Sequence, residues 1–370
     1  MTEARFDVAV IGAGPAGSCA AIAARRAGAR VLLVDRAEFP RAKACGCCLS
    51  PQAIAAIDAL DVGFVLANAL PLRTVRLSSR GREARFTRDA GVAIGRDVLD
   101  CRLAAAARDR GAYVRLGTAA RLVAPGVIEL GDARERVSAA VVVAADGIAG
   151  SSLAGDDTSE WNVAPESRIG FGATVPTGAV DCAGGEIRMH VDRSGYVGAV
   201  ALPDGTIDIA GAVLPEAVRA HGGPAESALR ILAGAVVDPS ALRAARWRGT
   251  PPLTRRRRTV AGPGLLLAGD AAGYVEPFTG EGIGWAAATG AAAGHLAAGI
   301  ARGGSSERDW PAIHAAIARR SAARCRAIAL LLRSPAAVQA CIALGRLAPS
   351  ALAGAASRIG RPAAAEGART

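Results

Sequence analysis

The sequence is poor in aromatic residues and in lysine. Aromatics make up 4% of its 370 residues, too few for a surface that stacks nucleic-acid bases on repeated Phe, Tyr or Trp side chains. Lys43 is the single lysine, so arginine carries nearly all of the positive charge behind a formal net charge of +11. Acidic residues are interleaved with these arginines, whereas a nucleic-acid binder concentrates its charge. Both features argue against nucleic acid as a partner.

Signals for export and for a membrane span are also missing. An apolar strand is predicted from about Phe6 with no charged and apolar leader before it, so we expect a cytoplasmic protein. The long uncharged stretch at residues 284–301 is mostly Ala and Gly and contains His295, which predicts a buried helix instead of a transmembrane one. Eight cysteines in such a chain need no disulfide framework.

Four consecutive arginines, residues 255–258, form the densest cluster of charge. We expect a solvated loop here, ahead of an apolar strand at residues 264–267. A surface for an anionic substrate or a membrane is the alternative.

The overall composition is that of a globular chain, with 51% apolar and 21% charged residues. One hydrophobic core usually stops growing at roughly 250 to 300 residues. The length of this chain therefore predicts two lobes that share a cleft.

A glycine motif near the N-terminus predicts a dinucleotide-binding turn. Residues 7–11 form a short apolar strand, an Ala-rich helix extends to residue 27, and a second apolar strand ends in an acid. Between the first strand and the helix stands Gly12-Ala13-Gly14-Pro15-Ala16-Gly17. G-x-G-x-x-G alone is weak evidence, but these flanking elements are the ones that a dinucleotide-binding unit requires.

The residues of this motif have distinct physical roles. Gly12 allows a sharp bend, Gly14 lets a pyrophosphate approach the backbone, and Gly17 lets the helix pack on the strand. Free amides at the helix start face the phosphates. Asp35, 18 residues after Gly17, can accept hydrogen bonds from a ribose diol. We therefore expect a cofactor that contains adenosine diphosphate with an unphosphorylated ribose.

The later chain alternates between this α/β pattern and antiparallel sheet. Residues 74–94 alternate like a hairpin with Gly81 near its turn, and an apolar run at 137–145 predicts a strand buried on both faces. Residues 167–214 contain several strands separated by turn signals, which we assign to a second lobe that faces the substrate. A helix is predicted to begin at residues 95–97. The chain returns to the first lobe at residues 264–272, and a long helix follows. Residues 309–348 are predicted to be helical, and the tail is expected to fray near Thr370.

Four motifs together resemble one family. They are the glycine motif, a Pro-Arg-x-Lys-x-Cys-Gly loop at residues 40–46, Asp146-Gly147, and Gly269-Asp270 followed by Pro277 and residues 280–284. In this order they resemble FAD-dependent proteins of the p-hydroxybenzoate hydroxylase fold. Among these the chain is most similar to the geranylgeranyl reductase family.

The resemblance implies an α/β fold, in which a Rossmann-like FAD-binding domain carries an inserted antiparallel-sheet (α+β) substrate domain and a C-terminal helical segment. The flavin is then expected between the two lobes. The implied boundaries are 1–72, 95–165 and 255–305 for FAD binding, 73–94 and 166–254 for the substrate domain, and 306–370 for the C-terminal helices and tail.

The resemblance also implies how FAD is held. Asp270 would bond the ribityl chain, and residues 280–283 would present amides and a helix start to the flavin N1 and C2 carbonyl, where reduction develops negative charge. Arg96 would approach the cofactor from its own helix start, and Arg36 would cover the adenine. The implied cofactor residues are Gly12, Gly14, Pro15, Ala16, Gly17, Asp35, Arg36, Arg41, Cys45, Gly46, Arg96, Gly269, Asp270, Gly280, Gly282 and Ile283.

The sequence departs from the family pattern in two places. No arginine follows Asp146-Gly147 at the position where the family carries one. Of the family's Tyr-x-Trp-x-Phe-Pro segment only Tyr196 and Pro203 are present, so prenyl specificity does not carry over. The Trp-x-Trp-x-Ile-Pro segment of flavin halogenases is also missing, which argues against halogenation.

Three cysteines lie in the loop expected beside the flavin. Cys45 and Cys48 have the C-x-x-C spacing of a redox pair, but the favoured interpretation is that Cys45-Gly46 shapes the loop while Cys47 and Cys48 fill apolar space. No histidine lies near them at ligand spacing, so no metal site is expected. Cys45 and Tyr196 are the candidate catalytic residues.

Three further features have both a structural and a functional interpretation. His190, like Tyr196, lies on a predicted strand and either faces the substrate or supports the fold. Glu281 at a helix start is a candidate cap. The apolar face around residues 328–332 and 342–347, flanked by arginines, either packs on the substrate lobe or faces lipid or a partner.

These features predict an FAD-dependent oxidoreductase that acts on a hydrophobic small molecule. The preferred reaction is reduction of a C=C bond with electrons from NAD(P)H or another donor. Because no second complete G-x-G-x-x-G unit is present, NAD(P)H would dock transiently. An FAD-dependent monooxygenase of an aromatic or polyketide-type substrate is the alternative, and an electron-transfer flavoprotein without its own substrate is the third hypothesis. The sequence does not indicate an oligomeric state.

Overall fold

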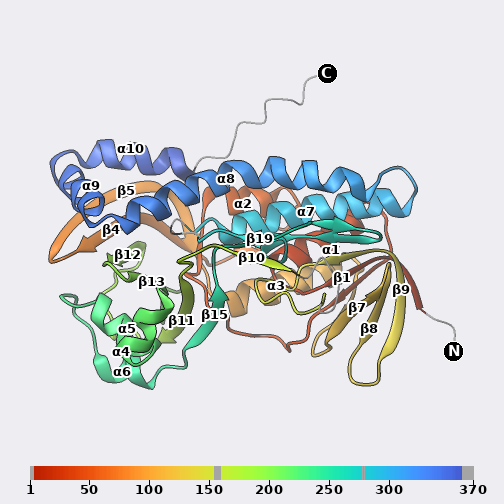
Figure 1. The fold of residues 1–370 in the computed structure, drawn as a ribbon, viewed down its shortest axis with the longest axis horizontal. Helices are drawn as coiled ribbons and strands as arrows, with labels where there is room; N and C mark the ends of the chain where they lie inside the picture. Colours follow the sequence, from red (N-terminus) through yellow and green to blue (C-terminus); the bar gives the residue numbers. More distant parts are fainter. Residues whose placement is uncertain (1–3, 154–159, 277, 279, 361–370) are drawn as a thin grey trace.

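The computed structural model describes residues 4–153, 160–276, 278 and 280–360. Two lobes lie side by side, each built on its own sheet, and helix α8 (Trp310–Arg333) runs along the top of the molecule in Figure 1. The predicted fraying near Thr370 lies outside the described residues. The mixed α/β fold is confirmed, whereas the exact domain boundaries stay predictions.

The first sheet has a parallel Rossmann-like core. Its main path runs in the order β17-β18-β9-β1-β2-β6, and the hairpin β7–β8 joins it at β9. The short strand β2 is buried along its whole length, as expected where helices cover a parallel sheet. Its strands are β1 (Ala4–Ile11), β2 (Val31–Val34), β6 (Tyr113–Arg115), β7 (Ala120–Ala124), β8 (Val127–Leu130), β9 (Glu135–Ala144), β17 (Ala261–Gly262) and β18 (Leu265–Leu267).

Helix α7 (Gly282–Ala301) is the buried helix predicted from the Ala-Gly stretch, and it packs tightly on α1 (Pro15–Arg26). A side chain at Gly290 would overlap the carbonyl of Ala16, and one at Gly294 would overlap that of Ala20. The two backbones therefore approach more closely than any residue but glycine permits at these positions. This contact brings the late part of the chain against the N-terminal turn.

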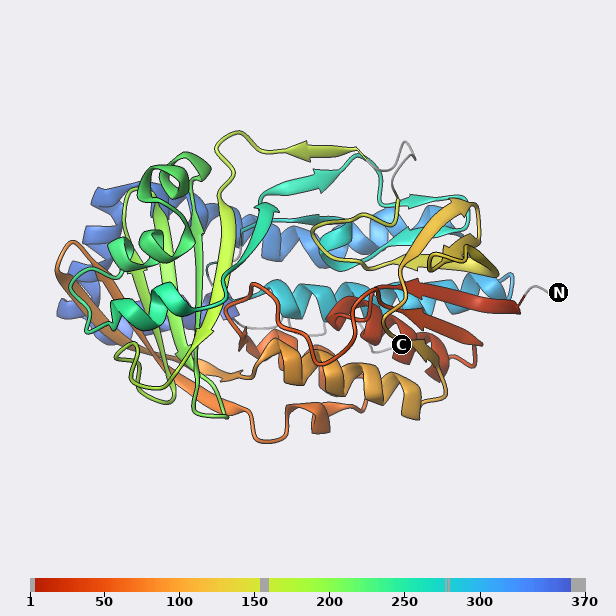
Figure 2. The ribbon, with the colours of Figure 1, turned by 90° about the horizontal axis from the view of Figure 1, so that it is seen from below.

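The second sheet is mostly antiparallel and forms the other lobe, seen beside the first in Figure 2. Its order is β15-β11-β14-β13-β12-β4-β5-β3, and β12 and β4 are a parallel pair. The predicted hairpin is the β4–β5 pair, with Gly81 in the left-handed region at its turn. Its strands are β3 (Cys48–Leu49), β4 (Leu70–Ser79), β5 (Arg82–Ala93), β11 (Ile169–Val175), β12 (Glu186–Val191), β13 (Gly195–Ala201), β14 (Ile207–Val213) and β15 (Arg248–Pro252).

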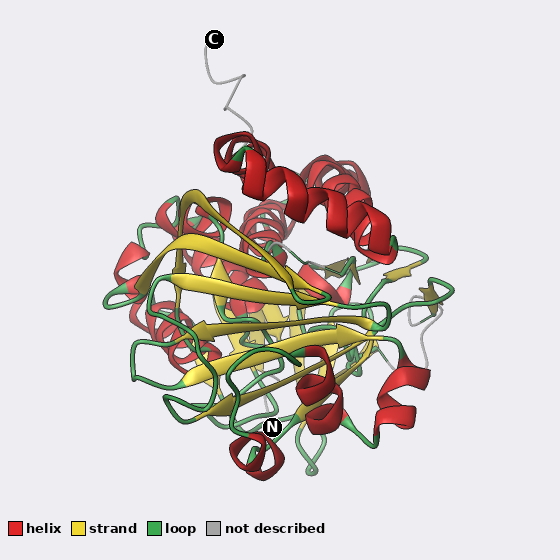
Figure 3. Ribbon diagram, turned by 90° about the vertical axis from the view of Figure 1, so that its left-hand side faces the viewer, coloured by secondary structure: helices red, strands yellow, loops and turns green. Residues whose placement is uncertain are grey.

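Helices cover the second sheet on both faces, as Figure 3 shows from its side. One face packs on a group of short helices that the sequence did not suggest, and the other on the C-terminal helices. The short helices are α4 (Pro215–His221), α5 (Pro224–Ile231) and α6 (Pro239–Ala244), and the C-terminal ones are α8, α9 (Pro335–Leu347) and α10 (Pro349–Gly360). The other helices of the described chain are α2 (Pro51–Asp58), α3 (Arg96–Asp109), η1 (Gly63–Leu66), η3 (Gly269–Ala271) and η4 (Glu307–Asp309).

The arginine run does not form the solvated loop predicted for it. Arg255–Arg257 is strand β16, which pairs with β10 (Trp161–Val163) and β19 (Gly273–Tyr274) in a small third sheet. Arg257 is buried, and its guanidinium carbon lies 4.0 Å from the centre of the Trp161 ring. It also donates to the Gly150 carbonyl oxygen at 3.0 Å. Stacking and carbonyl acceptors make burial of this cation possible.

One bent pair of helical segments in the described chain has the combined length and hydropathy of a membrane span. No single helix there is long and apolar enough to cross a bilayer. Residues 325–333 and helix α9 reach that length and hydropathy only together, and they are bent by 104°.

Candidate active site

A groove of about 610 Å³ follows the N-terminal turn of the first lobe. Its wall includes Gly12 and Gly14 at one side, and Asp35 and Arg36 beyond the end of β2. Helix α1 begins at this groove with Pro15 and Ala16 in its first turn, and no side chain caps its N-terminus. The helix start therefore offers free amides and a positive dipole end to an anion.

The three glycines of the turn differ in what surrounds them. Gly12 has a φ of +100°, and a side chain at Gly17 would overlap the Gly12 carbonyl, so both maintain the turn itself. A Cβ atom at Gly14 would meet only guanidinium nitrogens of Arg41 and Arg96, at 3.7 and 3.8 Å. Gly14 therefore keeps open a space bordered by cations, and this space fits a pyrophosphate.

Asp35 is buried at the end of β2, where its carboxylate is held by three donors. It accepts hydrogen bonds from the amides of Ala13 and Ala37 at 2.8 and 2.9 Å, and Arg41 lies 3.3 Å away. The exposed Arg36 lines the same groove. The carboxylate is thus fixed at the end of the groove where an adenosine ribose is expected.

A second cavity of about 460 Å³ continues from the groove into the space between the lobes. Six residues line both spaces, which makes the two continuous: Pro15, Ala44, Arg96, Thr250, Asp270 and Ala286. Most of the second cavity is apolar, with walls from the second sheet and from α8, α9 and α10. Several of the predicted site residues line it: Cys45, Gly46, Tyr196, Gly280, Gly282 and Ile283.

Asp270 lies where the groove meets the cavity, on the turn η3 that follows β18. Burial raises the pKa of its carboxyl to about 7, although the nearby cations Arg96 and Lys43 oppose the shift. The carboxyl makes no hydrogen bond or ion pair within the described residues. A half-buried carboxylate that lines both cavities fits a cofactor hydroxyl that donates to it, as the resemblance implies for the ribityl chain.

The pKa of Asp270 leads to a prediction for the cofactor-free protein. Its folded-state pKa lies above the ordinary 3.8, so the folded chain binds more protons between about pH 4 and pH 7, and the contribution of Asp270 to stability falls as pH rises through this window. We expect Asp270→Asn to be more stable than wild type near pH 8 and to lose that advantage toward pH 4. Thermal unfolding of both cofactor-free proteins across this range is the measurement. A difference in melting temperature between the two proteins that stays the same at every pH would contradict this prediction.

Helix α7 begins at Gly282 behind the cavity, and Glu281 does not cap it as expected. Glu281 is the N-cap residue but its carboxylate bonds no amide of the first turn. It is buried instead, and the Cys325 thiol donates to its Oε2 atom at 3.8 Å. The amides at the start of α7 are therefore not blocked by a side chain of their own. Pro277, part of the same motif, lies outside the described residues.

The cysteine loop places two thiols and a guanidinium together at the cavity wall. A hydrogen bond from Cys47 is the largest cause that lowers the pKa of Cys45 to about 6, and Arg96 lowers it further. The same contact raises the pKa of Cys47 well above its usual value. The contact thus favours the thiolate form at Cys45 and the thiol form at Cys47. None of the three cysteines of the loop is part of a disulfide.

Asp208 on β14 is a site residue that the sequence analysis missed. It is 4% exposed, lines the cavity, and its Oδ2 atom has no hydrogen-bond partner. Burial, followed by the charge of Cys45, raises the pKa of its carboxyl well above the usual range. The sequence of β14 could have indicated this residue, because successive side chains of a strand face opposite sides of the sheet. Ile207 and Ile209 face one side, so the acid between them faces the cavity.

Tyr196 lines the cavity beside a buried ion pair. Its ring meets that of Phe278 edge-on at 4.9 Å between centres, and Arg168 binds Glu276 at 2.8 Å behind it. Burial and the charge of Glu276 raise the pKa of the Tyr196 hydroxyl well above its usual value. Tyr196 is therefore a neutral, amphipathic part of the wall.

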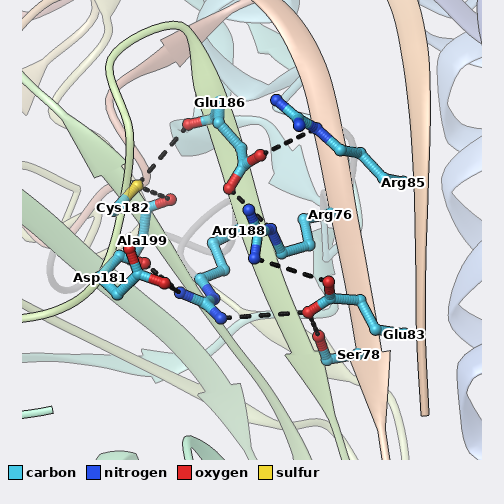
Figure 4. Close-up of polar contacts among 9 residues, drawn as sticks. All are labelled: Arg76, Ser78, Glu83, Arg85, Asp181, Cys182, Glu186, Arg188 and Ala199. Carbon is cyan, nitrogen blue, oxygen red and sulfur yellow. Dashed lines mark hydrogen bonds and ion pairs between the residues drawn. The ribbon is translucent and has the colours of Figure 1, made fainter. Parts of the chain in front are cut away.

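His190, in contrast, does not face the cavity, which corrects one of the two alternatives left open for it. Its neighbours Ile187 and Met189 line the cavity, so His190 points to the opposite face of β12. That face carries a charged network, drawn in Figure 4, in which Glu186 forms ion pairs with Arg76 at 2.9 Å and with Arg85 at 3.3 Å. Burial lowers the pKa of His190 to about 4. The network ties β4, β5 and β12 together behind the cavity wall.

Comparisons with known proteins show which proteins this chain is similar to. A family model described as FAD dependent oxidoreductase matches residues 7–40. A menaquinone reductase of Mycobacterium tuberculosis is 33% identical, over 89% of this chain and 84% of its own. Digeranylgeranylglycerophospholipid reductase 2 of Methanopyrus kandleri is 31% identical, over 79% and 77%.

A solved structure shares the fold. It is a geranylgeranyl bacteriochlorophyll reductase-like protein of Thermoplasma acidophilum, with a TM-score of 0.76, 20% identity, and coverage of 93% of this chain and 92% of its own. The family model and the two relatives define the chain as an FAD-dependent oxidoreductase. The chain belongs to the geranylgeranyl reductase family, which confirms the resemblance, while the roles of individual residues stay predictions.

Proposed function

We propose that this protein reduces a C=C bond of a polyprenyl lipid, such as the side chain of a quinone or of a glycerolipid. The observation that carries the proposal is the apolar cavity of about 460 Å³ that opens directly onto the cofactor groove. Its wall of Val, Leu, Ile, Met and Phe side chains matches an isoprenoid chain in polarity. The names of the relatives, a menaquinone reductase and a digeranylgeranylglycerophospholipid reductase, support this substrate class.

The residues present fit FAD along the groove. The amides of the first turn of α1 and the guanidiniums around Gly14 would hold the pyrophosphate, Asp35 the adenosine ribose, and Asp270 the ribityl chain. The start of α7 would face the flavin. When bound, FAD supplies the hydride for the reduction.

Reduction of a C=C bond also needs a proton, and Asp208 is placed to give it. Its carboxyl is held in the neutral form inside the cavity, with the unpartnered Oδ2 as the atom that carries the proton. Cys47 also lies against this carboxyl, and its single S–H, which otherwise donates to Cys45, would turn to the carboxylate left behind. The apolar walls exclude water, so the proton comes from a fixed position.

NAD(P)H is the proposed source of electrons. The chain has one complete G-x-G-x-x-G unit, at its N-terminus, so the nicotinamide would dock transiently at the cavity mouth. A cytoplasmic location, where such donors are available, is part of this proposal.

Turnover of a polyprenyl quinone by the FAD-loaded protein with NADPH tests the reaction. Addition of two hydrogen atoms to the substrate, seen by mass spectrometry, is the expected result. The same assay under oxygen-18 distinguishes the monooxygenase hypothesis, because incorporation of labelled oxygen would overturn the reductase. NADPH consumption that no lipid stimulates would favour the electron-transfer hypothesis.

The proposed contact of Asp270 gives a further prediction. Asp270→Ala should weaken FAD retention by about tenfold or more, because a charge-assisted hydrogen bond in a buried site is lost. Flavin absorbance per protein after gel filtration measures it. Asp204→Ala, on an exposed turn, is the control, and an Asp270 variant that stays as yellow as this control would refute the assignment.

A further inference from the structure

The C-terminal helices expose apolar side chains where a water-facing helix normally carries polar ones. On α9, Leu344 is 47% exposed and Leu347 is 85% exposed, and on α8 Leu330 is 66% exposed. The exposed residues follow helical spacing and form one stripe on each helix, here called the leucine face. The leucine face consists of Ala323, Ala327, Leu330 and Leu331 on α8 and of Ala336, Ala340, Ala343, Leu344 and Leu347 on α9.

The charged residues of α8 and α9 themselves have one sign. Between Asp309 and Glu366 the sequence contains eight arginines and no acidic residue. Arg333 is paired with Glu166 at 2.8 Å, but Arg346, in the last turn of α9, is exposed beside Leu347. An apolar stripe with arginines at its border matches the hydrocarbon and the head groups of an anionic lipid layer.

The leucine face is also the outer side of the cavity wall. The same helices turn Ile328, Leu332 and Val338 inward to line the cavity. Leu331 belongs to both surfaces, since it lines the cavity and is 38% exposed. The apolar lining thus continues through the helices to the outside of the protein.

We propose that the leucine face docks on an anionic lipid bilayer and brings the substrate cavity to its surface. This inference rests on the proposed function, because a polyprenyl substrate is dissolved in such a bilayer. Docking at this face would let the lipid pass from the membrane between α8 and α9 into the cavity without crossing water.

Flotation of the FAD-loaded protein with vesicles tests the proposal without any measurement of activity. We expect binding to vesicles that contain phosphatidylglycerol, weaker binding to vesicles of phosphatidylcholine alone, and loss of the difference at high salt. The double variant Leu344→Asp, Leu347→Asp should bind at least about tenfold more weakly, because charges then enter the hydrocarbon boundary. Both positions are exposed, so the variant should fold and keep its flavin.

Val236→Asp is the matched control. Val236 is 74% exposed and follows α5, on the opposite side of the second sheet from α9. This control should bind vesicles like wild type. Equal binding by the double variant and wild type would overturn the proposal.

Two further readouts separate the alternatives. If the leucine face instead joins two copies of this chain, wild type will be dimeric in light scattering, the double variant monomeric, and neither will bind vesicles, which overturns docking. Turnover of a substrate in detergent should survive in the double variant while turnover of a vesicle-embedded one is lost. If wild type reduces neither substrate, the proposed function fails, while flotation still decides docking.

Discussion

Gly14→Val should yield a folded but colourless protein. The extended backbone at Gly14, with φ −73° and ψ −174°, accepts a β-branched residue, and a Cβ atom there meets nothing closer than 3.7 Å. The added methyl groups would occupy the space proposed for the pyrophosphate. We expect FAD affinity to fall by at least about 100-fold, on the order of 3 kcal/mol.

Titration of the cofactor-free protein with FAD measures this effect, and circular dichroism checks the fold. Gly184→Val is the matched control, because nothing lies within 4 Å of that glycine. Gly17→Ala provides the contrast, since its Cβ would overlap the Gly12 carbonyl and should destabilise the lobe itself. Tight FAD binding by folded Gly14→Val would place the pyrophosphate elsewhere.

Asp208→Asn should abolish most of the turnover and leave the reduction of the flavin by NADPH intact. An amide has nearly the shape of a neutral carboxyl but cannot give up a proton at Oδ2. General acid catalysis of this kind contributes roughly 100- to 10,000-fold, and product formation should fall by a similar factor. Loss of the solvent isotope effect on the residual rate would support a change of proton source.

Rapid mixing separates the two half-reactions of this variant. Asp204→Asn is the control, because it makes the same change from acid to amide on the exposed turn of the same hairpin, before β14. An Asp208→Asn protein that forms product at the wild-type rate would remove this residue from the mechanism. Slow flavin reduction in the variant would assign it to donor binding instead.

Local patterns in the sequence were sufficient for much of the fold. The strand, glycine turn and helix around Gly12 depend on neighbouring residues, and the predicted hairpin and buried strand lie where the structure has them. The predictions that were wrong concern features that depend on residues distant in the sequence. The arginine run became strand β16 because Trp161, almost 100 residues earlier, supplies a ring for Arg257 to stack on.

The candidate site was predicted in part for the same reason. Motifs indicated the groove, but the cavity depends on which face of each strand turns inward, and a shift of one residue reverses that choice. Tyr196 points in and His190 points out for this reason alone. The sequence motifs did not indicate Asp208 because it belongs to none of them. Burial of a carboxyl group between two isoleucines costs free energy, however, and such a residue is therefore a candidate for a function.

The packing of α7 on α1 has a consequence for biosynthesis. Ala16 and Ala20 of α1 leave the ribosome early, but Gly269, Gly290 and Gly294, which pack on them, are made more than 240 residues later. Until then the nascent first lobe lacks β18 and the helix that covers α1, so its pigment pocket does not yet exist. A new chain can therefore bind flavin only after β18 and α7 have been synthesised. Until these elements pack on the N-terminal half, its apolar surface stays exposed and prone to aggregation, and such long-range contacts form slowly.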